Sequence, residues 1–208
     1  MLRVLVEAYA EPLSSFHAAV ITCAVVAFWG QLRLGELLAG SRKKFDPKYH
    51  PTRAAWIDAR TSVYVPWTKK TKHRGAVIRI PRQSSRTCGV LALKSYLQAV
   101  PAPSSAPLFC YIDRTGTRVP LTKRAFIDAI NTVWARHDFP RITGHAFRIG
   151  GTSELLRRGV APDIVKVSGR WDSDSFLQYW RNEDEVLPQH LDDLVVTTRR
   201  WQHAAPRG

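Results

Sequence analysis

The residues with the clearest chemical potential lie in the segment GHAFRIGGTSELLRRG, residues 144–159, and at a tyrosine further along the chain. On an α-helix, His145 and Arg148 are neighbours, because positions i and i+3 lie on the same side. Arginine offers a planar set of donors that matches phosphate oxygens, and histidine donates hydrogen bonds or transfers protons near neutral pH. Tyr179 follows Arg148 by 31 residues and is the last tyrosine of the chain. Two phosphate-binding groups ahead of a hydroxyl nucleophile indicate attack on a phosphodiester.

A histidine and an arginine three residues apart are, taken alone, more typical of a solvated helix face. The charge distribution of the chain strengthens the phosphodiester interpretation. The 208 residues contain 31 Lys and Arg against 17 Asp and Glu, a formal net charge of +14. Residues 41–94 hold 14 basic residues and only two acids, Asp46 and Asp58. Such a cluster attracts nucleic acid by neutralising phosphates and releasing counterions. We therefore predict a DNA-binding surface; a merely soluble basic surface is the alternative.

The composition bounds the fold and the cellular setting. With 45% hydrophobic residues and seven tryptophans, the chain can bury a core and fits one domain, or one domain with an appendage. The apolar run at residues 18–29 is too short to span a bilayer, so we expect a buried helix and no membrane association. The N-terminus has no signal-peptide pattern. Three widely spaced cysteines (Cys23, Cys88 and Cys110) lack metal-ligand spacing, which predicts reduced core thiols and no metal site.

The first long helix is expected to carry a cation near its end. Ser14 or Ser15 can cap a helix that runs to about Ala39 and stops at Gly40. Arg33 follows the apolar AVVAFWG, which places it at the edge of the core, where a guanidinium needs a partner. Glu36 is the candidate partner. A routine ion pair on a solvated helix face is the alternative reading of these two residues.

A basic β-hairpin is predicted next. Residues 62–67 and 76–81 are rich in Val, Ile and aromatic residues, which is typical of strands, and TKKTKHRG joins them. A lysine on such a loop can reach a neighbouring site and deliver a proton to a leaving oxygen. Most of the lysines in this loop are expected only to touch the DNA backbone.

The remaining chain alternates helices with a second short hairpin. We expect a helix over residues 87–100, a loop at 101–107, a hairpin within 108–121, and a helix from the N-cap Thr122 to about residue 137. Gly159 ends the helix that carries His145, and Pro162 opens another. Asp172 or Ser173 then caps a helix bearing Tyr179. The predicted fold class is α+β, mainly helical with a small antiparallel sheet.

The order of these motifs resembles the catalytic core of the tyrosine recombinases, the phage-integrase family. RLGE, a basic hairpin with a Lys-Thr step, HAFR, GRW and a tyrosine in a short helix follow one another over residues 28–181. The segment GRWDSDSFLQYWR is most similar to the crypton-like mobile-element recombinases of fungi. Five motifs in this order are far more specific than any one of them.

The resemblance implies a role for each matching residue. Arg33 and Arg148 would clamp the scissile phosphate with assistance from His145, and Tyr179 would be the nucleophile. Lys70 would protonate the departing 5′ oxygen, with Lys72 and Lys69 as alternatives.

Two further positions complete the implied site. Glu36 would support the first arginine. Trp171 would fill the position that holds histidine or tryptophan in the family, because it follows His145 by 26 residues, the usual interval. Arg170 is the alternative, because Tyr179 follows Trp171 by eight residues and nine is the commoner spacing.

The implied activity is DNA cleavage and rejoining through a covalent 3′-phosphotyrosyl intermediate, without metal, ATP or another cofactor, in recombination or integration of a mobile element. Two alternatives remain. One is a catalytically inactive DNA-binding remnant of such an enzyme, and the other is a type IB topoisomerase-like enzyme that relaxes DNA by letting one cut strand swivel. The partner that the resemblance implies is double-stranded DNA. The basic residues expected to contact it are Lys43, Lys44, Lys69, Lys72, Arg74 and Arg82.

The resemblance also sets expectations about organisation. The chain is expected to form a single catalytic domain over residues 1–208, without the N-terminal core-binding domain that closes a clamp around DNA. Residues 186–203 are expected to form a C-terminal helix that docks on a neighbouring protomer, giving a homo-oligomer on DNA, or that folds back on its own domain. The location is expected to be nuclear if the source is eukaryotic, and otherwise intracellular.

Overall fold

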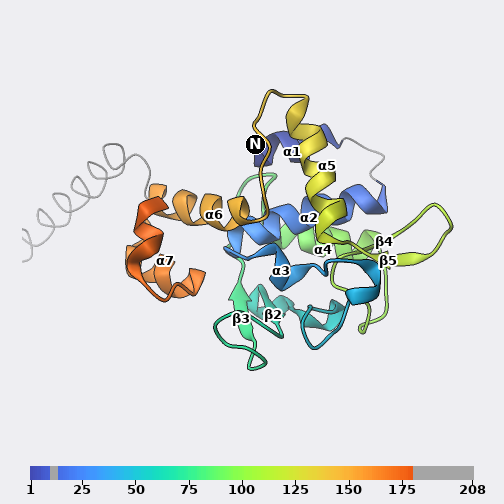
Figure 1. The fold of residues 1–208 in the computed structure, drawn as a ribbon, viewed down its shortest axis with the longest axis horizontal. Coiled ribbons are helices and arrows are strands. Elements are labelled where there is room, and N and C mark those ends of the chain that lie inside the picture. Colours follow the sequence, from blue (N-terminus) through green and yellow to red (C-terminus); the bar gives the residue numbers. More distant parts are fainter. Residues whose placement is uncertain (10–13, 180–208) are drawn as a thin grey trace, which may run out of the picture. The chain divides into compact units, whose positions relative to one another are not determined.

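The structure is a computed structural model that describes residues 1–9 and 14–179. It is mainly helical with two small antiparallel sheets, so the predicted α+β class is confirmed (Figure 1). The chain divides into two compact units, residues 1–151 and residues from Thr152 onward, which are described separately below. Among the described residues, no helix combines the length and the apolar character needed to cross a membrane.

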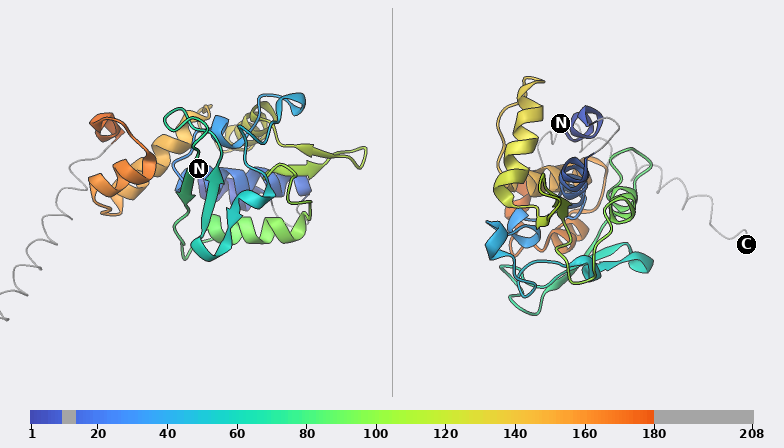
Figure 2. Two further views of the ribbon diagram at one scale, coloured as in Figure 1. Left: turned by 90° about the horizontal axis from the view of Figure 1, so that it is seen from below. Right: turned by 90° about the vertical axis from the view of Figure 1, so that its right-hand side faces the viewer.

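The first unit is built around one buried helix. α2 has α1 and α5 on one side and the β2–β3 hairpin on the other in Figure 1, and α4 runs beside it in Figure 2. The helices of this unit are α1 (Leu2–Ala8), α2 (Ser15–Trp29), α3 (Leu34–Leu37), α4 (Gly89–Ala99), α5 (Lys123–Ala135) and the first half of α6 (His145–Arg157). Three single-turn 3₁₀ helices accompany them: Arg42–Lys44, Arg53–Ala55 and Asp58–Arg60.

The sequence explains both the start and the burial of α2. The hydroxyl oxygen of Ser14 accepts a hydrogen bond from the backbone N–H of His17 at 3.2 Å, so Ser14 is the N-cap. Every residue from Ala18 to Ala27 is buried. The prediction of a buried apolar helix is therefore confirmed.

The prediction that this helix continues to about Ala39 is wrong. α2 ends at Trp29, and Gln31 takes a left-handed conformation with φ 47°. The Leu32 N–H donates to Ala27 O at 2.8 Å and the Gln31 N–H donates to Phe28 O at 3.1 Å, the two bonds of a Schellman motif. This closure ends α2 and separates it from the short helix α3. No local signal marks this turn, because glycine is the usual residue at the left-handed position and Gln31 stands there.

The predicted hairpin is confirmed as part of a three-stranded antiparallel sheet in the order β1-β2-β3. β1 is Trp56–Ile57, β2 is Ser62–Val65 and β3 is Ala76–Arg79, with Ser62 opposite Arg79. A second, two-stranded sheet consists of β4 (Cys110–Ile112) and β5 (Arg118–Pro120), as expected. Thr122 caps α5 by accepting from the Ala125 N–H, and this helix ends two residues earlier than predicted.

The second unit holds the rest of α6 and two shorter helices around a small core. Gly159, at φ 78°, follows α6, and Pro162 opens α7 (Pro162–Gly169), both as predicted. The helix bearing Tyr179 is a 3₁₀ helix, η4 (Asp174–Tyr179). The core of this unit consists of Leu156, Val165 and Phe176, with Leu155, Val160, Trp171 and Tyr179 packed against it. The C-terminal helix predicted at residues 186–203 lies outside the described residues.

Candidate active site

Arg33 and Glu36 form a buried connection at the start of α3. Arg33 is the N-cap residue of α3, not an interior helical residue. One carboxylate oxygen of Glu36 accepts from the backbone N–H of Arg33 at 3.0 Å, and the other accepts from Nη1 of Arg33 at 3.3 Å. The Glu36 side chain is 2% exposed and that of Arg33 is 37% exposed. Glu36 therefore orients a guanidinium whose outer part reaches the surface, which is not the routine solvated ion pair considered as an alternative.

Glycines allow α6 to approach this segment closely. A Cβ at Gly151 would overlap the carbonyl oxygen of Phe28, and one at Gly150 would lie 2.9 Å from the Phe28 ring. Just before the helix, a Cβ at Gly144 would lie 2.7 Å from Leu34. A Cβ under 3.0 Å from another atom forces something to shift, and the backbone of Phe28 yields less readily than the Leu34 side chain. The glycines, Gly151 above all, therefore permit the start of α6 to pack on the end of α2 and on α3. This packing brings GHAFRIGG to the Arg33 turn.

Arg148 is fixed at the point where these segments meet. Its side chain is fully buried, and Nη1 donates to the carbonyl oxygen of Gln31 at 2.8 Å. Gln31 is itself buried and occupies the left-handed turn after α2. The bond thus joins positions 117 residues apart. A charged donor held by a buried carbonyl ties α6 to the turn that leads into Arg33.

His145, the first residue of α6, is exposed and lies within the field of both arginines. Partial desolvation lowers the pKa of His145 below its ordinary value of 6.5, and the positive charges of Arg148 and Arg33 lower it further. The structure therefore brings together three of the predicted site residues, Arg33, His145 and Arg148, in the first unit. Because the pKa is lowered, the imidazole is mainly neutral at pH 7 in the free protein.

The predicted lysine lies at the tip of the β2–β3 hairpin. Thr68 and Lys72 exchange two backbone hydrogen bonds, of 3.3 and 2.9 Å, and enclose Lys69, Lys70 and Thr71. The Thr68 hydroxyl also accepts from the Thr71 N–H at 2.9 Å. Lys69 and Lys70 are exposed on this short closed loop.

The three lysines of the tip differ in their surroundings. Lys72 has a left-handed backbone, with φ 51°, and its ammonium lies 5.6 Å from the centre of the Trp67 ring. The base of the hairpin is tied to the Arg33 side of the fold, because a Cβ at Gly30 would lie 3.0 Å from Ile80, the residue after β3. Lys69 and Lys70 lie within the tip loop, and Lys72 closes it.

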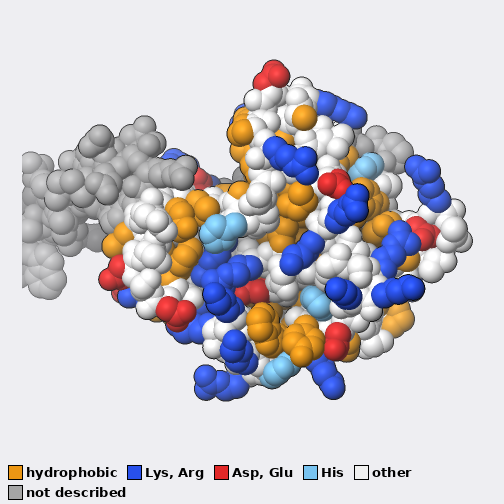
Figure 3. Space-filling view, in the orientation of Figure 1, with side chains coloured by type: hydrophobic (Ala, Val, Ile, Leu, Met, Phe, Trp, Pro, Cys, Tyr) orange, Lys and Arg blue, Asp and Glu red, His pale blue; other side chains and the backbone are white. Residues whose placement is uncertain are grey.

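The residues predicted to contact DNA lie on the surface. Figure 3 shows Lys and Arg side chains spread over the face that carries α3 and the β2–β3 hairpin. The predicted DNA-contacting residues, all of them exposed, are Lys43, Lys44, Lys69, Lys72, Arg74 and Arg82.

Within the second unit, Trp171 and Tyr179 lie together. Their ring centres are 5.6 Å apart, and the Ser153 hydroxyl donates to the backbone carbonyl of Tyr179 at 2.8 Å. Arg170, in contrast, has a left-handed backbone at the end of α7, and its Nη1 donates to the Ser168 carbonyl at 3.1 Å. Trp171 and Arg170 are the two candidates for the position that holds histidine or tryptophan in the family. Of these, Trp171 contacts the Tyr179 ring.

Lys123 is a further cation near the Arg33 turn, and no sequence motif marks it. It opens α5, where its backbone N–H donates to the carbonyl of Ala39 at 3.0 Å. Its exposed ammonium lies over Gly35 of α3, 3.2 Å from where a Cβ would be. In the part of the chain that the structure describes, this ammonium makes no hydrogen bond or ion pair. Only the fold could reveal it, because its proximity to the Arg33 turn spans about ninety residues of sequence.

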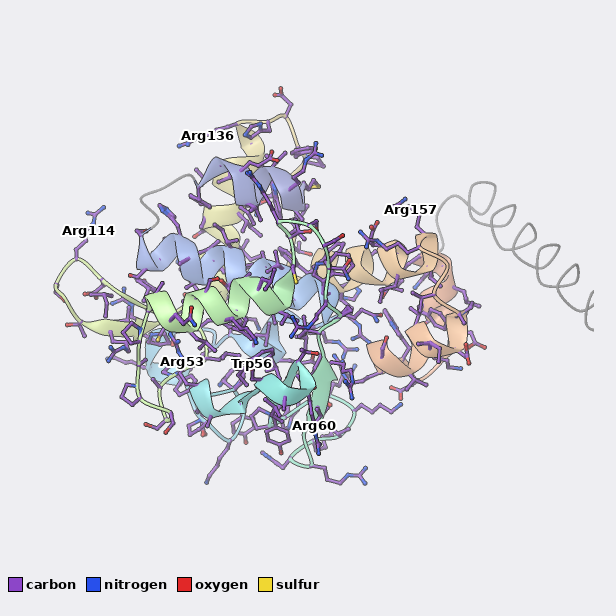
Figure 4. All side chains as sticks on the ribbon, turned by 180° about the vertical axis from the view of Figure 1, so that it is seen from behind. Arg53, Trp56, Arg60, Arg114, Arg136 and Arg157 are labelled. Atoms are coloured by element: carbon purple, nitrogen blue, oxygen red, sulfur yellow. The ribbon has the colours of Figure 1, made fainter. Side chains whose placement is uncertain are left out.

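Arg53, by contrast, is a residue of the basic segment 41–94 whose side chain is buried (Figure 4). Its Nη2 donates to the Tyr96 hydroxyl at 3.0 Å and lies 3.3 Å from the sulfur of Cys110. The three cysteines are buried and free, as expected. Among the described residues, no group of three or more His, Cys, Asp or Glu side chains is placed to hold a metal ion.

No protein-family model matches the sequence. No curated protein matches it either. Solved structures do match the fold. The XerA recombinase is 15% identical with a TM-score of 0.63, over 99% of this chain and 64% of that one. The Tn1549 transposon integrase in complex with transposon right-end DNA is 11% identical with a TM-score of 0.59, over 93% of this chain and 63% of the integrase.

A second structure of that integrase, with circular-intermediate DNA, is 12% identical with a TM-score of 0.53, over 92% of this chain and 64% of the other. The chain spans a little under two thirds of the length of each. The described fold is therefore that of a tyrosine recombinase catalytic domain.

Proposed function

We propose that this chain cleaves and rejoins DNA through a covalent tyrosyl intermediate in site-specific recombination. The observation that carries the proposal is the convergence of Arg33, His145 and Arg148 at one place in a fold shared with recombinases. A phosphodiester resists attack because its charge repels nucleophiles, so catalysis depends on fixed donors where negative charge builds up. Two arginines and a histidine supply such donors.

In the proposed reaction, Arg33 and His145 bind the scissile phosphate from the surface, and Arg148 stabilises the charge of the transition state from below. Arg148 has no exposed surface in the free protein, so direct contact with the phosphate requires neighbouring side chains to move when DNA binds. Glu36 keeps Arg33 in position through its two hydrogen bonds. A neutral His145 can donate from one ring nitrogen and accept at the other.

The bond changes balance without an external energy source. The Tyr179 hydroxyl gives its proton to the neutral imidazole of His145 while its oxygen forms a bond to phosphorus. The bond from phosphorus to the 5′ oxygen breaks, and Lys70 gives that oxygen a proton. The products are a 3′-phosphotyrosyl linkage and a free 5′ hydroxyl. Attack by a 5′ hydroxyl reverses the sequence and releases Tyr179, which joins strands without ATP. Trp171, in contact with the tyrosine ring, is the proposed further donor to the phosphate.

The partner that we propose is double-stranded DNA, bound through the exposed basic residues of the hairpin face and of residues 42–44. The proposal that the DNA belongs to a mobile element is supported by the similarity of GRWDSDSFLQYWR to crypton-like recombinases and by the transposon DNA in the Tn1549 integrase structures. Two further proposals accompany it: a single catalytic domain that acts as a homo-oligomer on DNA, and a nuclear location in a eukaryotic source or otherwise an intracellular one.

A covalent-trapping experiment tests this function. A pool of nicked duplexes with randomised sequence around the nick is incubated with the protein in EDTA, so that the short strand diffuses away after cleavage. The expected result is a protein–DNA adduct on a denaturing gel that Tyr179→Phe abolishes and Tyr111→Phe retains. Binding without an adduct would instead favour a non-catalytic DNA-binding protein. An adduct that relaxes supercoiled DNA but never joins two molecules would favour a strand-relaxing enzyme.

A further inference from the structure

In the β2–β3 hairpin, backbone pairing is interrupted between the strands and the tip that carries Lys69 and Lys70; we call the hairpin the lysine hairpin and this interrupted stretch its neck. The β2–β3 ladder ends at Ala76, and pairing resumes only with Thr68 and Lys72 beside the tip. The neck between them consists of residues 66–67 on one leg and 73–75 on the other. Within the described structure, no backbone hydrogen bond crosses it. The N–H groups of Arg74 and Gly75 donate to Thr71 O and Lys72 O, both at 3.2 Å, so the second leg is bonded to the tip but not to the first leg. Two residues opposite three cannot maintain ladder register, so the spacing of the two legs depends on side chains.

One exposed aromatic residue from another segment contacts both legs of this neck. The Tyr49 ring lies 5.1 Å from the His73 ring in an edge-to-face arrangement and 6.3 Å from the Trp67 ring, centre to centre. Lys72 adds a cation over the Trp67 ring. Tyr49 is nevertheless 42% exposed, so burial alone does not explain its position. Aromatic pairs of this geometry stabilise a fixed arrangement beyond the area that they bury.

The turn that carries Tyr49 is itself firmly held. Asp46 organises it: its carbonyl accepts from the N–H groups of Tyr49 and His50, both at 2.9 Å, and its side chain accepts from the Lys48 N–H at 2.9 Å. Further along, Arg53 fixes the following segment through its N–H bond to Ala106 O, in addition to its buried side-chain contacts. Tyr49 therefore sits on a well-ordered turn, and its ring contacts can restrict movement of the neck.

We propose that Tyr49 is a positioning residue for the lysine hairpin: by contacting Trp67 and His73 it fixes the neck, and thereby the direction in which Lys70 presents its ammonium. This rests on the proposed function, in which Lys70 protonates the leaving 5′ oxygen. The tip loop is short and closed by Thr68, so Lys70 has little freedom within the loop. Movement of the whole tip about the neck is the freedom that Tyr49 removes.

The test uses two substrates that differ at one atom. In the ordinary substrate the leaving group is a 5′ oxygen, which needs a proton. In the other it is a bridging sulfur, which leaves as a thiolate without one because thiols are far more acidic, with a pKa of about 8.5. We expect Tyr49→Ala to cleave the ordinary substrate about tenfold more slowly and Lys70→Ala about a hundredfold more slowly. Both deficits should disappear with the sulfur substrate.

Three further variants sharpen the test. Tyr49→Phe keeps the ring and should behave as wild type, because the Tyr49 hydroxyl makes no hydrogen bond among the described residues. His73→Ala removes the other partner and should reproduce the selective deficit even if Tyr49→Ala folds poorly. Tyr111→Ala removes a first-unit tyrosine that packs on Phe16, and should leave the ratio of the two rates unchanged. Thermal unfolding of each variant checks that it is folded.

The outcomes separate the two claims. If Lys70→Ala is rescued by sulfur while Tyr49→Ala and His73→Ala are equally slow on both substrates, the positioning role is overturned and the role of Lys70 stands. If Lys70→Ala is not rescued, the assignment of Lys70 under the proposed function fails, and the positioning role fails with it. Rescue of all three variants supports both.

Discussion

The two parts of the first unit that carry the proposed chemistry are held in different ways. Arg148 is buried and bonded to a backbone carbonyl, on a helix that glycines bring against α2. Lys70 is exposed on a three-residue loop whose neck lacks backbone pairing. Charges that stabilise a phosphate benefit from a fixed location, because their effect depends on organisation before the substrate arrives. A proton donor must reach its target, which suits a side chain on a short loop.

Removing the buried charge is expected to give the largest effect. Arg148→Ala should lower the rate of adduct formation by roughly 10²–10³-fold, about 2.7–4 kcal/mol, by analogy with loss of a donor to a developing oxyanion. It should also lower the unfolding temperature, because the Gln31 carbonyl loses its charged donor. Single-turnover cleavage and thermal unfolding measure the two effects. Arg124→Ala, at a largely exposed arginine of α5, is the control, and equal rates for both variants would contradict the assignment.

The glycine packing can be tested by adding one methyl group. Gly151→Ala should destabilise the protein by about 1–3 kcal/mol, because the new Cβ would overlap the Phe28 carbonyl and push α6 away from the Arg33 turn. Denaturant unfolding measures the change. Gly40→Ala is the matched control, since a Cβ there meets nothing within 4 Å and its φ is not in the left-handed range. A Gly151→Ala variant as stable as wild type would show that α6 does not need this close approach.

The lowered pKa of His145 predicts a pH dependence of DNA binding. In the free protein the imidazole stays neutral until the pH falls below its ordinary value of 6.5. A bound phosphate favours the protonated form and raises the pKa, so DNA binding should take up a proton. Affinity should therefore increase as the pH falls through the interval between the lowered and the raised pKa. Titrations at several pH values should show this trend weakened in His145→Asn and retained in His137→Asn.

The smallest expected effect concerns Lys123. If its ammonium contacts a phosphate beside the Arg33 turn, Lys123→Ala should reduce the salt dependence of DNA binding by about one phosphate contact. Arg124→Ala, next to it on α5 and already paired with Asp128, should change the slope less. Fluorescence anisotropy over a range of salt concentrations measures both. Equal slopes for the two variants would remove Lys123 from the DNA-binding surface.

The sequence predicted most of the elements because their signals are local. Ser14 and Thr122 cap helices, and Gly159 and Pro162 separate two more. Val, Ile and aromatic residues mark the β2–β3 hairpin. The end of α2 was missed because Gln31, not glycine, takes the left-handed position there. That turn is stabilised by Arg148, 117 residues away, which no local pattern reveals.

The candidate site was predictable only in part, for residues that belong to recognisable motifs. The order of motifs indicated Arg33, His145 and Arg148 through resemblance, and the fold places them near one another. Lys123 and Tyr49 were missed because their importance comes from contacts with distant segments, Gly35 for the first and the hairpin neck for the second. Neither residue has an unusual sequence context.

The most direct test of the central claim replaces the charge on the DNA. A nicked substrate with a neutral methylphosphonate at the scissile position no longer repels the nucleophile, so it no longer needs a fixed guanidinium. The account predicts that Arg148→Ala forms little adduct with the ordinary phosphate and regains adduct formation through Tyr179 with the methylphosphonate. If Arg148→Ala remains inactive on a methylphosphonate that wild type cleaves, Arg148 does not act by stabilising phosphate charge, and the proposed chemistry of this site is contradicted.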